Sequence, residues 1–183
     1  ALTSAAPAVW LTSSIEEPPD MAASSAPADR VESLHVELTP GEYESRAVTL
    51  WVNQDIETPS VSLDGLDSTA IPPGREHVRV RWTQRLLKRV QYKRLREDAV
   101  FSWRFLRDEP PEALAKGQMR QLVVTVRAAA DAASGEYKGR LVLRGSGDLM
   151  AVLPVVVKVA SFRLKTPAKR VGCYYGIRGV STE

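Results

Sequence analysis

The chain has 183 residues, of which 44% are hydrophobic and 26% are charged, a balance that suffices for one domain with tails or two very small domains. The formal net charge is +3, which by itself is far from the signature of a nucleic-acid-binding protein, and we predict no nucleic-acid partner. The single cysteine, Cys173, excludes an internal disulfide and a cysteine-rich metal site. No apolar run approaches the ~20 residues of a membrane-spanning helix, so we predict no membrane partner either.

Short strand patterns separated by turn residues occupy the first part of the chain. After a tail at residues 1–7, the apolar residues 8–15 predict a short strand, and the Pro-, Ala- and Ser-rich residues 16–30 predict a linker-like loop. Residues 31–38 alternate between apolar and polar side chains, which indicates a strand with one buried face. By the same criteria, further strands are predicted at 47–52, 61–63 and 77–82.

Residues 84–98 fit both a helix and a strand. The spacing of Leu86, Leu87, Val90 and Leu95 could mark one face of a helix. The spacing of Leu86, Val90 and Tyr92 could equally continue a strand. We favour extended structure, because Trp82 leads directly into the segment and no capping residue begins a helix. In the remainder, a single helical turn or loop is predicted at 110–114, and strands are predicted at 100–106, 121–127, 138–144 and 149–160.

The pattern as a whole comprises about nine to ten strands with turns every ~8–12 residues and almost no helix, which is typical of a β-sandwich. We therefore predict an all-β fold, an Ig-like or jelly-roll-like antiparallel β-sandwich over residues 8–165. Most strands alternate, so each sheet is expected to have one buried and one solvated face. Residues 145–148, Gly-Ser-Gly-Asp, predict a hairpin turn between two of the strands.

The segment Ser134-Gly-Glu-Tyr-Lys-Gly139 lies between two predicted strands. Gly135 suits a turn, and Tyr137 is expected to pack its ring over the end of the core while its hydroxyl bonds to nearby backbone. Gly139 indicates a bulge or a close approach of two strands. Pro154 lacks a backbone donor, so it should lie at a sheet edge or at a bulge.

Three segments carry a resemblance to a known family. They are Leu38-Thr-Pro-Gly-Glu-Tyr-Glu-Ser-Arg46, Ala133-Ser-Gly-Glu-Tyr-Lys-Gly139 and Leu153-Pro-Val-Val-Val-Lys-Val-Ala-Ser-Phe-Arg-Leu164. Together they resemble the amino-terminal β-sandwich of bacterial enzymes similar to glycoside hydrolase family 123 and of uncharacterised relatives, over residues 9–165. Residues 171–177 resemble the first strand of the (β/α)8 barrel that follows in such enzymes. The basic segment 75–107 and Lys165-Thr-Pro167 depart from the family pattern.

The resemblance implies a parent enzyme that acts on glycans and is exported from a bacterial cell, to the periplasm, the cell surface or the medium. In that family the catalytic carboxylates of a retaining, substrate-assisted mechanism lie in the barrel, and no position of this chain corresponds to them. Residues 166–183 are then a linker and the start of a missing C-terminal domain, which would be the partner of the sandwich. No catalytic residue is carried over to this chain.

A basic segment provides the candidate binding surface. Residues 75–109 contain 11 Lys or Arg and 5 Asp or Glu residues, an excess of six positive charges. The segment could be a solvated sheet face, a surface that faces the missing domain, or a site for a polyanion such as a sulfated or uronic-acid glycan. The candidate residues combine basic and aromatic side chains and are Trp82, Arg85, Lys88, Arg89, Tyr92, Lys93 and Arg94.

Other residue types with catalytic or binding chemistry are expected to be structural. The carboxylates of Glu42, Glu44 and Glu136 lie in or beside turns, and hydrolysis of a glycoside would require two of them to face one sugar. His35 and His77 lie on the polar faces of strands without the further ligands of a zinc site. We predict no metal and no cofactor. The four tryptophans, Trp10, Trp51, Trp82 and Trp103, are expected to be buried by default, and Trp82, next to the basic segment, is the one for which an exposed position is the alternative.

We therefore expect a non-catalytic N-terminal accessory domain of a larger glycoside-hydrolase-like enzyme. A carbohydrate-binding module is the first alternative, and it predicts exposed coplanar aromatic rings or a concave groove. A structural or adhesion Ig-like domain of a surface protein is the second, and it predicts neither feature.

Overall fold

The computed structural model describes residues 7–12, 30–66, 68–74, 76–92 and 96–165, and for residues 12 and 85–104 it describes the backbone alone. These residues form eleven β-strands and no helix, so the predicted all-β fold is confirmed. None of them forms a helix that is long and apolar enough to cross a membrane.

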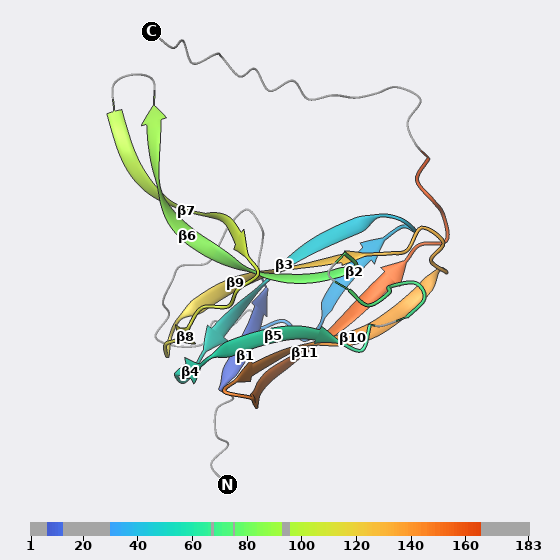
Figure 1. Cartoon of the computed structure of the whole chain (residues 1–183), viewed down its shortest axis with the longest axis horizontal. Coiled ribbons are helices and arrows are strands. Elements are labelled where there is room, and N and C mark those ends of the chain that lie inside the picture. Colours follow the sequence, from blue (N-terminus) through green and yellow to red (C-terminus); the bar gives the residue numbers. More distant parts are fainter. Residues whose placement is uncertain (1–6, 13–29, 67, 75, 93–95, 166–183) are drawn as a thin grey trace.

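A five-stranded sheet forms one layer of the molecule, with the strand order β1-β3-β9-β6-β7 (Figure 1). All of its neighbouring strands pair in antiparallel orientation. Its strands are β1 (Ala8–Thr12), β3 (Tyr43–Val52), β9 (Met119–Arg127), β6 (Val78–Tyr92) and β7 (Arg96–Arg107).

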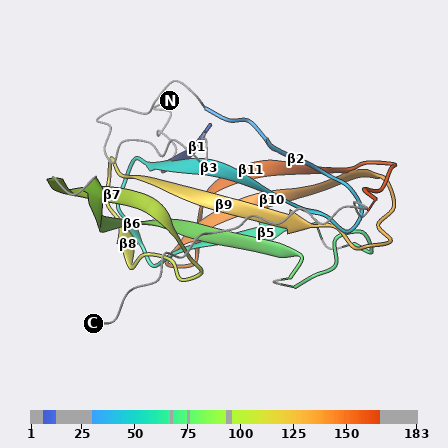
Figure 2. The same ribbon diagram turned by 90° about the horizontal axis from the view of Figure 1, so that it is seen from above.

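A four-stranded sheet with the order β2-β11-β10-β5 forms the second layer. Figure 2 shows the strands of the two layers running in roughly the same direction, which is the aligned packing of a β-sandwich. The strands of this sheet are β2 (Leu34–Leu38), β11 (Asp148–Val159), β10 (Gly135–Gly145) and β5 (Pro59–Asp64).

One pair of strands departs from the predicted antiparallel arrangement. β2 pairs with β11 in parallel, from Leu34 opposite Val155 to Leu38 opposite Val159. Parallel neighbours require a long crossover connection, and here nearly the whole domain lies between the two strands. The periodicity of residues 31–38 indicates a strand but carries no information about its direction relative to a partner.

The helical turn or loop that the sequence predicts at residues 110–114 is partly wrong. Ala113–Leu114 form a short strand, β8, that pairs with β4 (Ile56–Glu57). Pro110 and Pro111 disfavour helical backbone for the residues before them, and Leu114 becomes fully buried beside Ile56. A two-residue strand is too short for any alternating pattern to reveal it.

The core lies between the two layers and is built from the alternate residues of each strand. The inward-facing side chains of the five-stranded sheet include Trp10, Leu50 and Leu122, and those of the other sheet include Leu141 and Val157. The predicted burial of tryptophan is confirmed for Trp10, Trp51 and Trp82, which are at most 6% exposed. The side chain of Trp103 lies outside the described residues.

The predicted role of Tyr137 is confirmed, but residues 135–139, which the sequence places in a turn, form the start of β10, because they pair with β11. The hydroxyl of Tyr137 donates a hydrogen bond to the carbonyl of Ala133 at 2.9 Å, and its half-buried ring packs against the core. Gly139 is a site of close approach, because a Cβ there would lie 2.7 Å from both the Asp64 carbonyl oxygen and the Leu66 Cγ. Pro154 lies one position before the β2 pairing begins at Val155, where that side of β11 is still an edge.

The turn predicted at residues 145–148 closes the β10–β11 hairpin. Its central residues, Ser146 and Gly147, have φ angles of 49° and 92°. Positive φ at both positions is the signature of a type I′ turn, whose twist matches that of the flanking strands.

The strands β6 and β7 continue beyond the sandwich as a projecting arm (Figure 1). β6 pairs with β9 only from Val78 to Trp82, whereas its pairing with β7 continues to Tyr92 opposite Arg96. The extended structure favoured for residues 84–98 is thus confirmed where the backbone is described. A register shift between Gln84 and Leu86 marks the base of this arm.

Candidate functional site

The structure separates the residues of the predicted basic surface. Trp82 lies on the inner face of β6 and is 5% exposed, so its ring contributes to the core and not to an exposed surface. Lys93 and Arg94 lie outside the described residues. The other four are placed along the β6 strand of the arm, with only their backbone described, and are Arg85, Lys88, Arg89 and Tyr92. A binding role for the arm stays a prediction.

The carboxylates near the Gly-Glu-Tyr segments have local structural partners. Glu42 accepts hydrogen bonds from the backbone N–H and the hydroxyl of Thr39, at 3.0 and 3.1 Å. Glu44 forms an ion pair with Arg46 at 2.6 Å. Glu136 is exposed and pairs through its backbone with Lys158 on β11. The first two carboxylates thus hold a turn and a surface pair, as expected for structural residues.

The histidines likewise have local roles. His35 is exposed and lies 2.8 Å from the Ser33 hydroxyl, while Nδ1 of His77 lies 3.1 Å from the Arg127 carbonyl oxygen. Within the described ranges, no group of three or more His, Cys, Asp or Glu side chains is arranged to hold a metal ion.

A different basic surface forms on the outer face of the five-stranded sheet. It is a hollow of about 540 Å³, which we call the outer hollow, and it lies over β3, β9 and β6. Two cross-strand rows build it: Tyr43 lies opposite Arg127, and Ser45 lies opposite Thr125, which in turn lies opposite Arg79. The residues that line it are Gly41, Tyr43, Glu76, His77, Arg79, Arg81, Thr125 and Arg127.

Strand alternation explains why these residues share one face. In β6, Val78 and Val80 point into the core, so the intervening Arg79 and Arg81 point outward. Leu122, Val124 and Val126 of β9 are buried in the same way, which directs Thr125 and Arg127 to the outer face.

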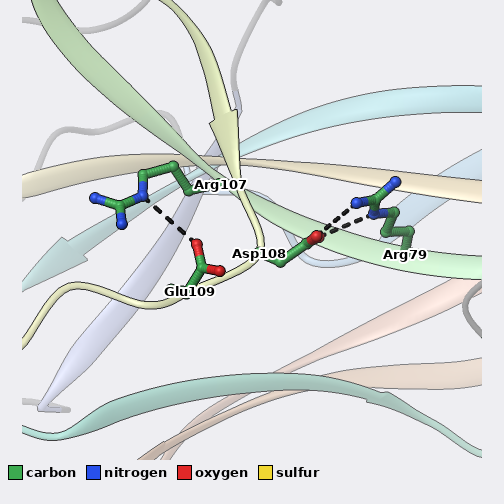
Figure 3. A network of polar contacts seen from close by, with 4 residues as sticks. All are labelled: Arg79, Arg107, Asp108 and Glu109. Carbon is green, nitrogen blue, oxygen red and sulfur yellow. Dashed lines mark hydrogen bonds and ion pairs between the residues drawn. The ribbon is translucent and has the colours of Figure 1, made fainter.

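Two residues that line the outer hollow, Arg79 and Thr125, have polar contacts that hold their side chains in position. Asp108 accepts two hydrogen bonds from Arg79, at 2.9 and 2.5 Å, and Arg107 pairs with Glu109 beside them at 3.6 Å (Figure 3). The hydrogen bonds and the charge of Asp108 raise the pKa of Arg79. The hydroxyls of Ser45 and Thr125 lie 2.9 Å apart and bond to each other.

Two further side chains of the outer hollow are less engaged. Tyr43 is 68% exposed, which is unusual for a large aromatic side chain. Arg81 is half-buried, and its Nε atom is buried without a hydrogen-bond partner among the described residues. The hollow therefore combines an exposed ring with guanidinium groups.

The outer hollow was not predicted from the sequence, which pointed to the arm instead. The alternation of Val78, Arg79, Val80 and Arg81 does indicate an outward basic row. Tyr43 and Arg127, however, are separated from that row by tens of residues, and only the strand order β3-β9-β6 brings them beside it.

A second hollow of about 420 Å³ lies at the end of the four-stranded sheet, where the chain leaves β11. Its lining includes Leu38, Lys158 and Phe162. Phe162 and Leu164 follow β11 directly and are 61% and 63% exposed. This end of the sandwich therefore presents apolar side chains to solvent.

No protein-family model and no curated protein matches this chain. Among solved structures, the chain is similar to a family 123 glycoside hydrolase from Clostridium perfringens, described in a study of glycolipid glycan hydrolysis. The TM-score is 0.58 at 8% sequence identity, over 71% of this chain and 23% of that chain. At this identity the likeness is one of fold, and this chain corresponds to less than a quarter of the length of that enzyme.

Proposed function

We propose that this chain is the non-catalytic accessory β-sandwich of a larger glycan-hydrolysing enzyme and that it packs against the catalytic domain of the same polypeptide. The observation that carries the proposal is the shared fold, which spans 71% of this chain but only 23% of the glycoside hydrolase. Most of such an enzyme lies outside the shared part. The family resemblance of the sequence supports export from a bacterial cell, because polymeric glycans are encountered outside the cell.

The contacts of the two carboxylates in the Gly-Glu-Tyr-Glu segment support a non-catalytic role. Glycoside hydrolysis in its usual form requires two carboxyl groups on either side of one glycosidic bond. Glu42 is hydrogen-bonded within its own turn, and Glu44 is paired with Arg46. Glu42 lines the hollow beside Phe162, but its carboxylate is bonded to Thr39, and Glu44 lines neither hollow.

The exposed side chains after β11 support packing against a following domain. Phe162 and Leu164 lie where the chain leaves the sandwich, next to a hollow lined by Leu38 and Ala160. Clustered apolar side chains on a surface typically mark an interface. A domain that continues from this end would cover them without any long linker.

The most direct test is the reading frame that follows Glu183 in the gene. We expect it to continue into a (β/α)8 barrel with an adjacent Asp-Glu pair. A stop codon at this point would contradict the proposal.

The interface itself can be tested in the full-length enzyme with the double variant Phe162→Ala, Leu164→Ala. In the parent enzyme, calorimetry should show one coupled unfolding transition for the sandwich and the catalytic domain. In the double variant, the two domains should unfold in separate transitions. Leu149→Ala is the matched control, because Leu149 is 60% exposed but lies at the hairpin turn that begins β11. Coupled unfolding in the double variant would argue against an interface at this end.

A second candidate function, a carbohydrate-binding module, is favoured by the exposed Tyr43 in the outer hollow. The two candidates make different predictions for the isolated chain, since only the second requires it to bind a glycan without the catalytic domain.

A further inference from the structure

We infer that the outer hollow is a binding site for a carboxylate-bearing sugar, with Arg127 and Arg81 facing the carboxylate and Tyr43 contacting the sugar ring. The choice of a sugar rests on the proposed function, whereas the choice of an anion rests on the guanidinium groups alone. The site lies on the sandwich itself and is separate from the arm and from the end near Phe162.

The arginines come from two adjacent strands and lie on the same face of the sheet. Arg127 ends β9, and the backbone N–H of Arg127 donates to the His77 carbonyl at 2.7 Å, which holds the start of β6 beside it. Arg79 and Arg81 follow on β6 at alternate positions. Three arginines within two strands thus line one hollow.

The charges of the outer hollow favour an anion. Glu76 is the acidic residue of its lining, and Asp108, which lies outside the lining, is engaged with Arg79. Arg79 is therefore neutralised and fixed in place. Among the described residues, Arg81 and Arg127 have no carboxylate partner, so two positive charges remain for one acidic side chain at the edge. His77, bonded to the Arg127 carbonyl, is the remaining titratable group of the lining.

A carboxylate suits this arrangement better than a neutral ligand does. The planar guanidinium of arginine matches the two oxygens of a carboxylate and binds them in pairs. The Nε of Arg81 is buried and lacks an acceptor, and a positive group removed from water gains from a nearby negative charge.

The other groups of the outer hollow suit a sugar ring. The ring of Tyr43 is 68% exposed beside Arg127, and an aromatic face in this position can pack on the C–H groups of a pyranose. Thr125 lines the hollow, and its hydroxyl uses one bond for the neighbouring Ser45, which leaves hydrogen-bonding capacity for a ligand hydroxyl. The volume of about 540 Å³ lies within the range of small-ligand sites.

Isothermal titration calorimetry of the 183-residue chain tests the inference with three probes: a uronic-acid disaccharide, a neutral disaccharide of the same linkage, and sodium sulfate. We expect the acidic disaccharide to bind, with an affinity about tenfold or more above that of the neutral one and of sulfate. Arg127→Ala and Tyr43→Ala should each weaken its binding by about tenfold. Arg140→Ala, an exposed arginine of the other sheet, is the matched control and should bind as the parent chain does.

If the folded parent chain does not bind the acidic disaccharide, the inference is overturned. Equal affinity for the acidic and the neutral disaccharide would overturn it as well. So would equal affinity for the acidic disaccharide and sulfate together with unchanged binding by the Tyr43→Ala variant. The outcome is independent of the gene test above: a stop codon after Glu183 would refute the accessory role while leaving an observed acidic-sugar site in place.

Discussion

Tyr137 shows how one side chain defines the end of this sandwich. Its ring packs against the core, and its hydroxyl returns to the carbonyl of Ala133 in the preceding turn. Gly139, two residues later, lets β10 approach the Asp64–Leu66 segment within the distance that a Cβ would occupy. A single short segment therefore supplies both a turn anchor and a close contact between strands.

Tyr137→Phe should lower the free energy of unfolding by about 0.5–1.5 kcal/mol, because the bond to Ala133 is lost while the packing of the ring remains. Urea denaturation measures the change. Tyr43→Phe serves as the control, since Tyr43 is largely exposed, and it should leave stability unchanged. An equal loss in both variants would show that the Tyr137 hydroxyl does not stabilise the corner.

Gly139→Ala should destabilise the fold by about 1–3 kcal/mol, because its Cβ would overlap backbone and a packed side chain. The nearest atoms are the Asp64 carbonyl oxygen and the Leu66 Cγ, each at 2.7 Å. The neighbouring exposed Lys138 gives the control variant Lys138→Ala, which should have little effect. Thermal unfolding of the two variants in parallel would reveal whether the contact is as close as described.

At the scale of the elements, β6 and β7 have two different roles. Their ends nearest the sandwich belong to the five-stranded sheet, where Trp82 fills the core and Val78 to Trp82 pair with β9. Beyond Gln84 the two strands pair only with each other in the described backbone. The arm is therefore a ribbon that the sandwich does not need for its own core.

Replacement of residues 85–104 by an Asn-Gly turn between the paired residues Gln84 and Phe105 should leave the unfolding temperature nearly unchanged. The physical reason is that the removed pairing lies outside the two-layer core. Trp82→Ala is the contrasting variant and should cost about 3–5 kcal/mol. A large destabilisation on removing the arm would instead show that it covers part of the sandwich.

At the scale of the whole molecule, a strand near the beginning of the described chain closes the fold against its last strand. β2 pairs in parallel with β11, and its inward residues, with Val36 at 0% exposure, join the core. Glu37, on the outward face, forms an ion pair with Lys158 at 3.5 Å. The sandwich is thus complete only when both ends of the domain are present.

Val36→Ala should lower the free energy of unfolding by about 2 kcal/mol through lost burial and the cavity left behind. Glu37→Ala removes only an exposed ion pair and should cost less than about 1 kcal/mol. Guanidinium denaturation of both variants makes the comparison. Similar costs would indicate that β2 is held mainly by its surface and not by its core face.

The sequence allowed the fold class and most strands to be predicted, for reasons that can be traced to particular residues. The alternation of Leu34, Val36 and Leu38 reports a half-buried strand, and the glycines around Ser146 report a hairpin turn. The strand β8 could not be predicted, because its two residues gain their extended form from pairing with Ile56. The basic surface predicted from the sequence lies in one contiguous segment, whereas the outer hollow combines residues from three strands.

The sequence by itself determined the all-β class, the alternating burial of strands such as β2 and the turn at residues 145–148, since these depend on hydrophobicity, alternation and local backbone preferences. Only the tertiary structure decided which strands are neighbours. That choice set the parallel direction of β2 and placed Tyr43 and Arg127 beside Arg79 and Arg81. Strand partners are selected by how two sheets bury their apolar faces together, and this is a property of the whole chain that no local pattern contains.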